Sequence, residues 1–285
     1  MGLLSKEYKE YVLDDLKNYT ALTRPRKASF VERTLVTSVP IEKLHPNPED
    51  EFSDPNIGPN NNIVGHYESH LARNDGFTRD SKVEPLVVEK LSTGGYMILN
   101  GHHRWLAAKK AGIKRVPVQI VNSTHEEDIL SRLQKLNNSM FVSFDLDEVL
   151  ICDSDQYPTE TLPFPLRQIF PWPIRKDAGL LIRTLHELGF DVWVYTGNYY
   201  TPLYVRMTFL MHRATLDGVI SGMNLQHSSP GIKKAFRKKY HTIVHIDNEQ
   251  LLWVNTKTKE YDSFELPPDQ TWAAQAAAGI KKILS

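Results

Sequence analysis

Hydrophobic residues in the first half of the chain recur with different periods in different segments. Between residues 5 and 22 they lie three or four positions apart with charged residues between them, which predicts an amphipathic helix. Residues 49–80 show no sustained period and are interrupted by proline, glycine and asparagine, which predicts a long loop. Shorter patterns predict strands at 34–38, 85–89, 96–99 and 116–121 and helices at 105–111 and 126–136.

The second half alternates short apolar runs with segments of helical period. This alternation predicts a parallel α/β sheet whose functional residues lie at the carboxyl ends of the strands. Five prolines between residues 158 and 173 interrupt that segment too often for a folded cap domain. The expected strands are 140–144, 192–195, 218–220 and 242–246, and the expected helices are 178–188, 202–212, 231–240 and 273–284.

A short polar run, Asn137-Asn138-Ser139, is the best candidate for a linker between two domains. We therefore expect a helical extension at 1–33, an α+β domain at 34–137 and an α/β domain at 138–285. The fold class of the whole chain is then α/β.

Composition and charge narrow the classes of function. Hydrophobic residues make up 41% of the chain and charged residues 24%, as in globular proteins. The 34 basic and 34 acidic residues cancel, so the chain lacks the positive charge that drives non-specific binding to nucleic acid. Its one cysteine, Cys152, excludes an internal disulfide framework. Because neither an apolar leader nor a run of about 18 apolar residues is present, we expect a cytoplasmic protein with no membrane partner.

Two acidic residues, Asp145 and Asp147, directly follow the apolar strand at 140–144. Thr196 ends the next strand, and Asp247 ends the last strand of the alternating region. Because parallel strands bring their carboxyl ends to one edge of a sheet, we expect these side chains to meet there. Carboxylates so close together need a cation or a shared proton, and Mg²⁺ is the natural partner of such oxygen donors.

This ordered set of Asp145, Asp147, Thr196, a helical lysine and Asp247 resembles the haloacid dehalogenase (HAD) superfamily. The resemblance covers 140–285 and implies a Rossmann-like domain with a parallel sheet and no large cap. It implies that Asp145 is a nucleophile that forms an aspartyl-phosphate and that Asp147 serves as acid and base. Thr196 would hold a phosphoryl oxygen.

The same resemblance assigns a lysine and a metal ion to the reaction. Lys233 would neutralise charge on the nucleophile and the phosphate, with Lys234 as the alternative. Mg²⁺ would be bound by Asp145, the carbonyl of Asp147 and Asp247. The implied activity is Mg²⁺-dependent hydrolysis of a phosphate ester.

A second motif, Gly101-His102-His103-Arg104, follows the strand at 96–99. Glycine permits a tight turn from strand to helix. The N–H groups at the helix start, with two histidines and an arginine, then form a seat for an anion such as phosphate. Together with the flanking segments 39–44 and 116–118, the motif resembles the ParB/sulfiredoxin superfamily over 34–122. Its four residues are therefore candidates for binding nucleotide or phosphate.

The residue after the glycine distinguishes the branches of that superfamily. Sulfiredoxins carry a catalytic cysteine there, whereas this chain has His102. Chromosome-partitioning ParB proteins look like Gly-Glu-Arg-Arg at this point and continue into a helix-turn-helix. The form found here looks more like the ParB-like free serine kinases, which implies a bound nucleotide, ATP or ADP, and an acidic base from the loop after the first strand. Glu49 and Glu51 are the favoured acids, with Glu42 and Asp50 as alternatives.

Three functions are consistent with these motifs. The favoured one is a two-domain phosphoryl-transfer enzyme, an HAD-type phosphatase joined to a nucleotide-binding, kinase-like domain, acting on a phosphorylated small molecule or a nucleotide. The alternative makes the first domain a regulatory module that binds nucleotide or nucleic acid and delivers substrate to the phosphatase. Neutral charge and the missing helix-turn-helix disfavour nucleic acid. The third, a catalytically inactive scaffold, requires the whole acidic set to be idle.

Overall fold

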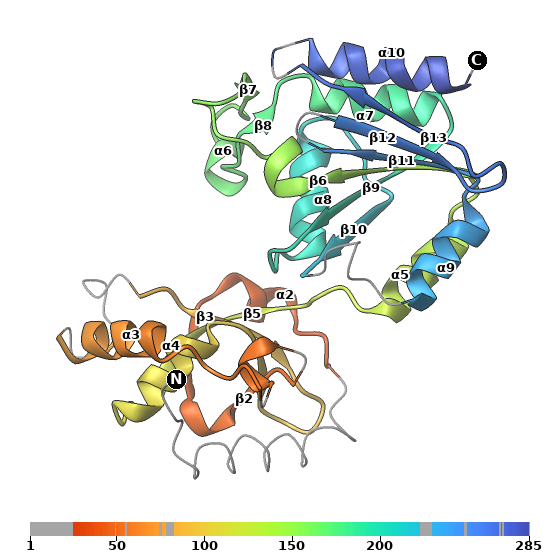
Figure 1. Ribbon diagram of the computed structural model, residues 1–285. Coiled ribbons are helices and arrows are strands. Elements are labelled where there is room, and N and C mark those ends of the chain that lie inside the picture. The colour runs from red at the N-terminus through yellow and green to blue at the C-terminus, as the bar shows by residue number, and fades with distance from the viewer. Residues whose placement is uncertain are drawn as a thin grey trace. The chain divides into compact units, whose positions relative to one another are not determined.

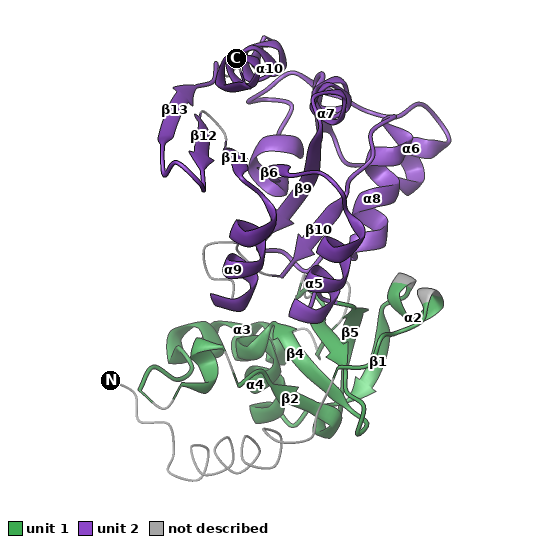
Figure 2. Ribbon diagram, turned by 90° about the vertical axis from the view of Figure 1, so that its right-hand side faces the viewer, with its two compact units in different colours: residues 1–122 green, residues 123–285 purple. Residues whose placement is uncertain are grey.

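The protein divides into two compact units, Met1–Asn122 and Ser123–Ser285 (Figure 2). Each unit has its own sheet and its own hydrophobic core. The helix expected at 5–22 lies outside the residues that the structure describes. The computed structural model describes residues 25–48, 50–54, 56–73, 76–77, 83–222, 230–247, 250–267, 269 and 271–284.

Unit 1 is built on a five-stranded mixed sheet with the strand order β1-β5-β3-β4-β2. β3 (Leu86–Lys90) and β4 (Tyr96–Asn100) form the expected antiparallel hairpin, which turns through Gly94 and Gly95, both at positive φ. The other strands are β5 (Arg115–Val121), parallel to β3, β1 (Thr37–Pro40), antiparallel to β5, and β2 (Leu44–Pro46), parallel to β4.

Two helices, α3 (Asn61–Arg73) and α4 (His102–Lys110), complete the core of unit 1. The two helices pack against each other (Figure 1). Trp105 of α4 is fully buried among the side chains of the sheet, and Val64 and Leu71 of α3 join the same core. Burial of these large side chains supplies most of the favourable free energy of folding of this unit.

Helix α3 corrects the expectation of a loop over 49–80. Val64 and Leu71 are buried two helical turns apart, with the half-buried Tyr67 between them. Polar residues fill most other positions of α3, so its apolar period is short, and the proline- and glycine-rich flanks dominate the composition of the segment. The part before α3 is irregular apart from one short 3-10 turn, η2 (Glu51–Ser53).

The strand expected at 34–38 begins later, at β1, because a short helix, α2 (Phe30–Thr34), precedes it. Ser29 starts α2 with a capping box, in which the backbone N–H of Ser29 donates to the Glu32 carboxylate at 2.8 Å. Satisfying these groups stabilises the first turn of a helix against the β propensity of the residues around it. A 3-10 turn, η1 (Ile41–Lys43), then links β1 to β2.

Unit 2 has a six-stranded sheet with the order β10-β9-β6-β11-β12-β13. The four strands from β10 to β11 are parallel and alternate with helices, as expected. These strands are β6 (Met140–Asp145), β9 (Phe190–Thr196), β10 (Gly218–Ser221) and β11 (Thr242–Ile246), and the helices between them are α7 (Ala178–Glu187), α8 (Pro202–Met211) and α9 (Pro230–Lys239).

The last two strands, β12 (Gln250–Asn255) and β13 (Tyr261–Glu265), run antiparallel to their neighbours. The expectation of a wholly parallel sheet is therefore wrong at this edge. Asn255 explains the reversal, because its side-chain oxygen accepts hydrogen bonds from the backbone N–H groups of Lys257 and Thr258, at 3.0 and 3.1 Å, and closes a hairpin turn.

Helices cover both faces of this sheet (Figure 1). One face, with Val142 and Phe144, packs against α7, α8 and the C-terminal helix α10 (Trp272–Leu284), where an Ala-rich helix was expected. The other face, with Phe141 and Trp193, packs against α9 and α5 (Glu126–Lys135). Because both faces are buried, the central strands are mostly apolar rather than alternating, with the buried Ser143 and Asp191 among the exceptions.

Helix α5 belongs to unit 2, so the chain divides after Asn122 and not at the polar run 137–139. Ile129 and Leu133 of α5 are buried in the cluster formed with α9. The hydroxyl of Thr124, just before α5, donates to the carbonyl of Val219 in β10 at 3.2 Å. These contacts are made far apart in sequence, so the local pattern did not reveal them.

The segment between β6 and α7 is small. Within it lie only β7 (Thr159–Glu160), α6 (Leu166–Ile169) and β8 (Ile174–Arg175), besides the turn that follows β6. The absence of a large cap, expected from the prolines, holds for this fully described segment. Among the helices described in the whole structure, none is long and apolar enough to cross a membrane.

Arg175 joins this small insert to the C-terminal helix. Its side chain is fully buried, and the guanidinium carbon lies 4.3 Å from the ring centroids of both Tyr157 and Trp272. A cation held between two aromatic faces is strongly attracted to both when water is excluded. Replacing Arg175 with an uncharged residue removes this attraction and leaves a gap between the rings of Tyr157 and Trp272.

We expect Arg175→Leu to lower the free energy of unfolding of unit 2 by about 2 to 3 kcal/mol, because it loses two cation–π contacts in a buried position. Urea unfolding followed by circular dichroism measures the change. Arg167→Leu, the same substitution at an exposed position of α6, is the matched control and should change the free energy by less than about 0.5 kcal/mol. Equal effects of both substitutions would contradict the role given to Arg175.

Candidate functional site

The parallel register of unit 2 brings the predicted acidic residues to one edge of the sheet. Asp145 of β6 stands opposite Tyr195 of β9, and Phe144 stands opposite Ile246 of β11. Thr196 and Asp247 each follow one of these partners in the chain. The structure therefore gathers the carboxyl ends of β6, β9 and β11 as the sequence predicted.

Asp145 is held by the turn that follows it. Its Oδ1 accepts hydrogen bonds from the backbone N–H groups of Asp147 and Glu148, at 2.9 and 3.2 Å. That turn is a single π-helical turn, η3 (Leu146–Leu150), anchored by its buried leucines and Val149. The Oδ2 atom of Asp145 makes no hydrogen bond to any described residue, so one carboxylate oxygen is available for chemistry.

The surroundings of Asp145 oppose its ionisation. Burial raises the pKa of this carboxyl above its usual range, the two backbone N–H groups lower it, and the charges of Asp147 and Glu148 raise it further. A cation bound beside Asp145 would lower the pKa of its carboxyl again.

Thr196 positions Asp147. The Thr196 hydroxyl is fully buried, donates to Oδ2 of Asp147 and accepts from the backbone N–H of Asn198 at 2.9 Å. Tyr200 also bonds to the Asp147 carboxylate, and burial together with this acid raises the pKa of Tyr200 to about 12. Asp147 is thus fixed by two hydroxyl groups. The expected contact of Thr196 with a phosphoryl oxygen stays a prediction.

Asp247 is exposed at the end of β11, and its backbone N–H donates to the carbonyl of Gln250 at 2.8 Å. The pKa of Tyr195 indicates that Asp247 lies close to the other acids. Burial raises the pKa of the Tyr195 hydroxyl well above its usual range, and the charges of Asp145, Asp247 and Glu148 raise it further. One tyrosine ring therefore faces acids from two strands and from the turn η3.

The donor set fits a magnesium ion in its chemistry. Asp145 and Asp247 offer carboxylate oxygens, and Asp147 offers a backbone carbonyl, which are the hard oxygen ligands that Mg²⁺ prefers. Among the residues that the structure describes, no group of three or more His, Cys, Asp or Glu side chains forms a metal site. The magnesium ligands stay a prediction based on two carboxylates and one carbonyl.

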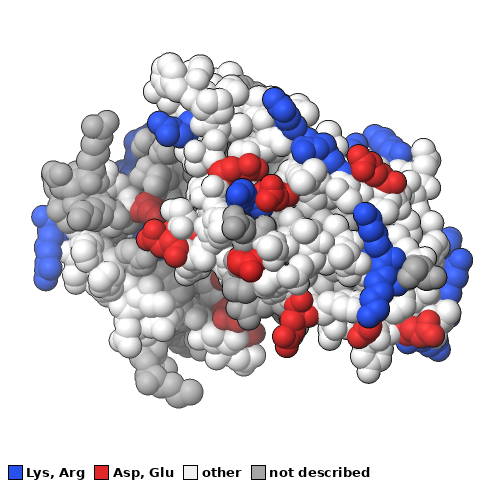
Figure 3. Space-filling model, turned by 90° about the horizontal axis from the view of Figure 1, so that it is seen from above, with Lys and Arg blue, Asp and Glu red and all other residues white. Residues whose placement is uncertain are grey.

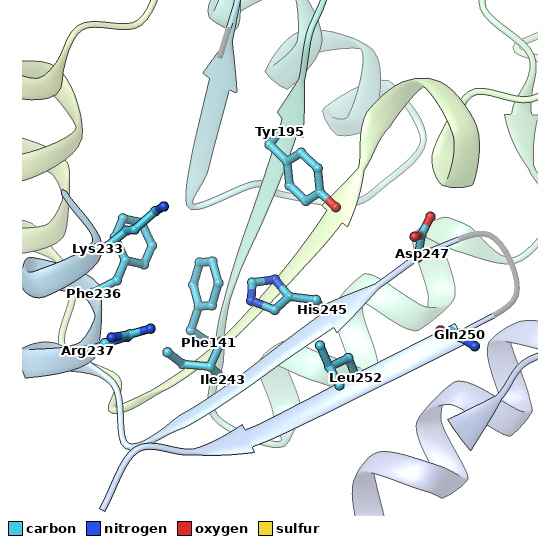
Figure 4. Close-up of a pocket in the computed structure, with 10 residues that line it drawn as sticks. All are labelled: Phe141, Tyr195, Lys233, Phe236, Arg237, Ile243, His245, Asp247, Gln250 and Leu252. Carbon is cyan, nitrogen blue, oxygen red and sulfur yellow. The ribbon is translucent and has the colours of Figure 1, made fainter. Parts of the chain in front are cut away.

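Lys233 is the better placed of the two candidate lysines. It lines a cavity of about 320 Å³ together with Tyr195 and Asp247, whereas Lys234 is not part of the lining. Figure 4 shows Lys233 and Asp247 on opposite sides of this cavity, one on α9 and the other after β11. Its predicted role beside the nucleophile stays a prediction.

In unit 1, Gly101 makes the tight turn that its motif predicted. Its φ is 102°, a left-handed conformation that favours glycine, and a Cβ there would lie 2.8 Å from Leu86 and 3.1 Å from Arg104. The chain then enters α4 at His102. The turn is therefore a requirement of the local packing as well as a candidate for binding a phosphate.

His102 is buried and faces the loop after β2. Its Nε2 accepts a hydrogen bond from the backbone N–H of Asn47 at 3.1 Å, and its Nδ1 lies 3.6 Å from Oδ2 of Asp50. Burial lowers the pKa of His102 to about 4, the Asp50 carboxylate raises it and His103 lowers it. His102 is therefore neutral at pH 7 and holds this loop as a hydrogen-bond acceptor.

His103 makes the matching contact to the next segment. Its Nε2 accepts from the backbone N–H of Asn60, just before α3, at 3.0 Å. Burial lowers the pKa of His103, and the Asp50 charge raises it. Asp50 is the acid beside both histidines, whereas Glu51 is exposed and Glu49 lies outside the described residues. Asp50 also caps η2, because its Oδ1 accepts a hydrogen bond from the backbone N–H of Phe52 at 2.9 Å. Aspartate is a preferred N-cap residue, and this preference is the signal that the sequence carries for Asp50.

Arg104 is buried and directed into the protein. Its guanidinium donates to the carbonyls of Glu84 and Pro85, at 2.9 and 3.1 Å, and to the side-chain oxygen of Asn100 at 2.8 Å. These bonds tie α4 to the start of β3 and the end of β4. In this arrangement Arg104 is a structural residue, and its predicted contact with phosphate stays a prediction.

Comparison with known proteins supports a likeness for part of the chain. Residues 70–136, which include the Gly101–Arg104 motif, match the ParB N-terminal domain family. A stretch of 38 residues is 55% identical to the probable chromosome-partitioning protein ParB of Vibrio cholerae, and this match covers 13% of this chain and 13% of that protein. The resemblance to ParB proteins is thus confirmed over residues 70–136, and the family match ends before Asp145.

Three solved structures were also found to be similar. They are ParB from Caulobacter crescentus complexed with CTP-γ-S (23% identity, 37% of this chain and 56% of that one), sulfiredoxin from Arabidopsis thaliana (22%, 33% and 91%) and a free serine kinase in complex with AMP (11%, 81% and 91%). Each TM-score is 0.25, which is too low to support an argument about this chain.

The low pKa of His102 predicts that unit 1 loses stability in acid. In the unfolded chain this histidine takes up a proton as the pH falls through about 6.5, whereas in the folded chain it does so only near pH 4. The contribution of the neutral His102 ring to the free energy of unfolding of unit 1 is complete above pH 7. It falls by about 3 kcal/mol as the pH drops to 4. Hydrogen-exchange protection of the α4 amides, corrected for intrinsic exchange, measures it.

The variant His102→Gln is the control for this pH dependence, because its amide oxygen still accepts from Asn47 N–H but does not titrate. Its protection should depend less on pH than that of the wild-type chain. The same loss of protection in both proteins would show that other groups cause it.

Proposed function

We propose that this chain is a two-domain phosphoryl-transfer enzyme, in which unit 2 is an HAD-type phosphatase and the ParB-like region of unit 1 binds a nucleotide. One observation carries the proposal for unit 2. Asp145 presents an oxygen that no described residue engages, directly beside Asp147, at the carboxyl edge of a parallel sheet. Such an edge is where open α/β sheets bind ligands.

The proposed reaction has two steps. Oδ2 of Asp145 attacks the phosphorus atom of a phosphate ester, the bond from phosphorus to the ester oxygen breaks, and Asp147 gives its proton to the departing oxygen. In the second step Asp147 takes a proton from water, the water oxygen attacks phosphorus, and the bond to Asp145 breaks to release phosphate. Thr196 and Tyr200 keep the Asp147 carboxyl beside Asp145 during both steps.

Magnesium fits this proposal. When bound by Asp145, Asp247 and the carbonyl of Asp147, Mg²⁺ supplies positive charge against the negative oxygens of the phosphate. The raised pKa of Asp145 supports the need for it, since a carboxyl that resists ionisation is a poor nucleophile until a cation compensates its neighbours.

For unit 1 the geometry favours nucleotide binding over a kinase reaction. Both histidines and Arg104 are engaged within the unit, which leaves the N–H groups at the start of α4 as the main phosphate donors. For a kinase reaction, the candidate base would be Asp50, whose carboxylate lies 3.6 Å from Nδ1 of His102 and also acts on His103. The regulatory alternative, in which unit 1 binds nucleic acid, gains no support from the charge of the chain, because its 34 basic and 34 acidic residues cancel. On the face that Figure 3 shows, basic and acidic side chains are also interspersed.

We expect the full chain with Mg²⁺ to release phosphate from p-nitrophenyl phosphate, and Asp145→Asn to reduce the rate by at least about 1,000-fold, because the substituted amide is not a nucleophile. Asp155→Asn, the same change at an exposed turn of the following segment, is the control and should keep the wild-type rate. Absence of release by the folded wild-type chain from this ester and from a panel of alkyl phosphates would contradict the proposal.

We expect ATP or ADP to bind the full chain, and His103→Glu to weaken binding at least tenfold. Glutamate keeps an acceptor for Asn60 N–H and suits a helix start, but its charge repels phosphate. Lys110→Glu, a larger change of charge at the other end of α4, is the control and should have a small effect. Calorimetry measures both affinities, and equal loss in the two variants would contradict phosphate binding at this helix start.

A further inference from the structure

We infer that the cavity beside Asp247 binds the leaving group of the phosphate ester, and that this leaving group is an aromatic ring carrying a second anionic group. The inference rests on the proposed phosphatase and names its substrate class. The cavity adjoins the proposed reaction site because Tyr195 and Asp247 belong to its lining. Its volume of about 320 Å³ is at the small end of the range for small-molecule pockets.

Apolar side chains form the floor of this cavity. Phe141 of β6, Ile243 of β11 and Leu252 of β12 lie along the sheet, and Phe236 of α9 closes one side (Figure 4). Phe141 and Phe236 meet edge to face with their centroids 4.9 Å apart. Leu252 is 41% exposed although it is large and apolar. A flat ring laid on this floor would cover Leu252 and stack on aromatic neighbours.

The two ends of the cavity differ in charge. Lys233 and Arg237, one turn apart on α9, lie at one end, and Asp247 lies across from them (Figure 4). The guanidinium of Arg237 makes no hydrogen bond or ion pair with a residue in the described part of the chain. Its planar set of donors suits a carboxylate or phosphate. A phosphoryl group at the Asp247 end therefore leaves Arg237 to bind a second anion.

Between the two ends lies a partly buried histidine, His245. Nδ1 of His245 shares a hydrogen bond with the hydroxyl of Ser143, which is fully buried. Nε2 of His245 has no hydrogen-bond partner among the described residues, and the ring lines the cavity. The ring therefore offers one directed hydrogen bond to a molecule in the cavity. A polar substituent on the aromatic ring of the proposed leaving group would form this hydrogen bond with Nε2 of His245.

The test measures binding without turnover. The full-length Asp145→Asn variant with Mg²⁺ is titrated by calorimetry with phenyl phosphate and with 4-carboxyphenyl phosphate. We expect the carboxylated ester to bind at least tenfold more tightly, and Arg237→Gln in the same background to remove that difference. Lys238→Gln, a neutralised cation outside the cavity on the same helix, should keep it.

A second variant tests the position of the ring. Leu252→Trp changes a partly exposed residue, so the protein should fold, and the larger side chain should weaken the binding of both esters. Failure of either ester to bind, equal affinity for the two, or an unchanged difference in Arg237→Gln would overturn the inference.

The phosphatase assay separates this inference from the function on which it rests. Cleavage of both esters by the wild-type chain without preference would leave the phosphatase standing and remove the cavity assignment. Binding of 4-carboxyphenyl phosphate that depends on Arg237, without cleavage of it by the wild-type chain, would retain the cavity and remove the phosphatase.

Discussion

The register between β6, β9 and β11 is the constraint on which the candidate chemistry depends. It sets Asp145 opposite Tyr195 and Phe144 opposite Ile246, so three strand ends separated by about fifty residues each deliver polar groups to one edge. Register in a sheet buried on both faces is strongly specified, because a slip by one residue would exchange the side chains of its two cores. The apolar residues of these strands therefore fix the positions of the acids. The acids themselves do not have to contribute to the free energy of folding.

In unit 1 the polar side chains of the Gly101–Arg104 motif mainly stabilise the packing of the unit. The two histidines accept backbone N–H groups from two different irregular segments, and Arg104 donates to two backbone carbonyls. Buried backbone groups of irregular chain need such partners, since no strand or helix satisfies them. A sequence motif rich in polar residues at a helix start can thus serve to hold the loops around it, and binding of an anion would have to use the backbone groups that these side chains leave.

The strands and helices of the second half were predictable because each has its own local period, and open α/β sheets bind ligands at the carboxyl ends of their strands, which is where the candidate residues were expected. The sequence did not predict α3, whose buried face has few apolar residues, or β12 and β13, whose hairpin depends on the Asn255 turn. It also favoured Glu49 and Glu51 over Asp50, although Asp50 alone of the described acids approaches His102. Which of several neighbouring acids meets a histidine depends on the loop conformation, and no sequence period encodes it.

The crowding of acids around Tyr195 leads to a last physical step. Burial raises the pKa of the Tyr195 hydroxyl most, and Asp145, Asp247 and Glu148 all raise it further, so their negative charges act on the same small region. Like charges held close together favour the uptake of a proton or a cation. A proton on Asp145 would remove the nucleophile, whereas a cation would preserve it and attract a phosphate as well. In the proposed phosphatase, cation binding and phosphate chemistry would therefore both follow from this one arrangement of charge, because the cation would allow an acidic edge to receive an anionic substrate.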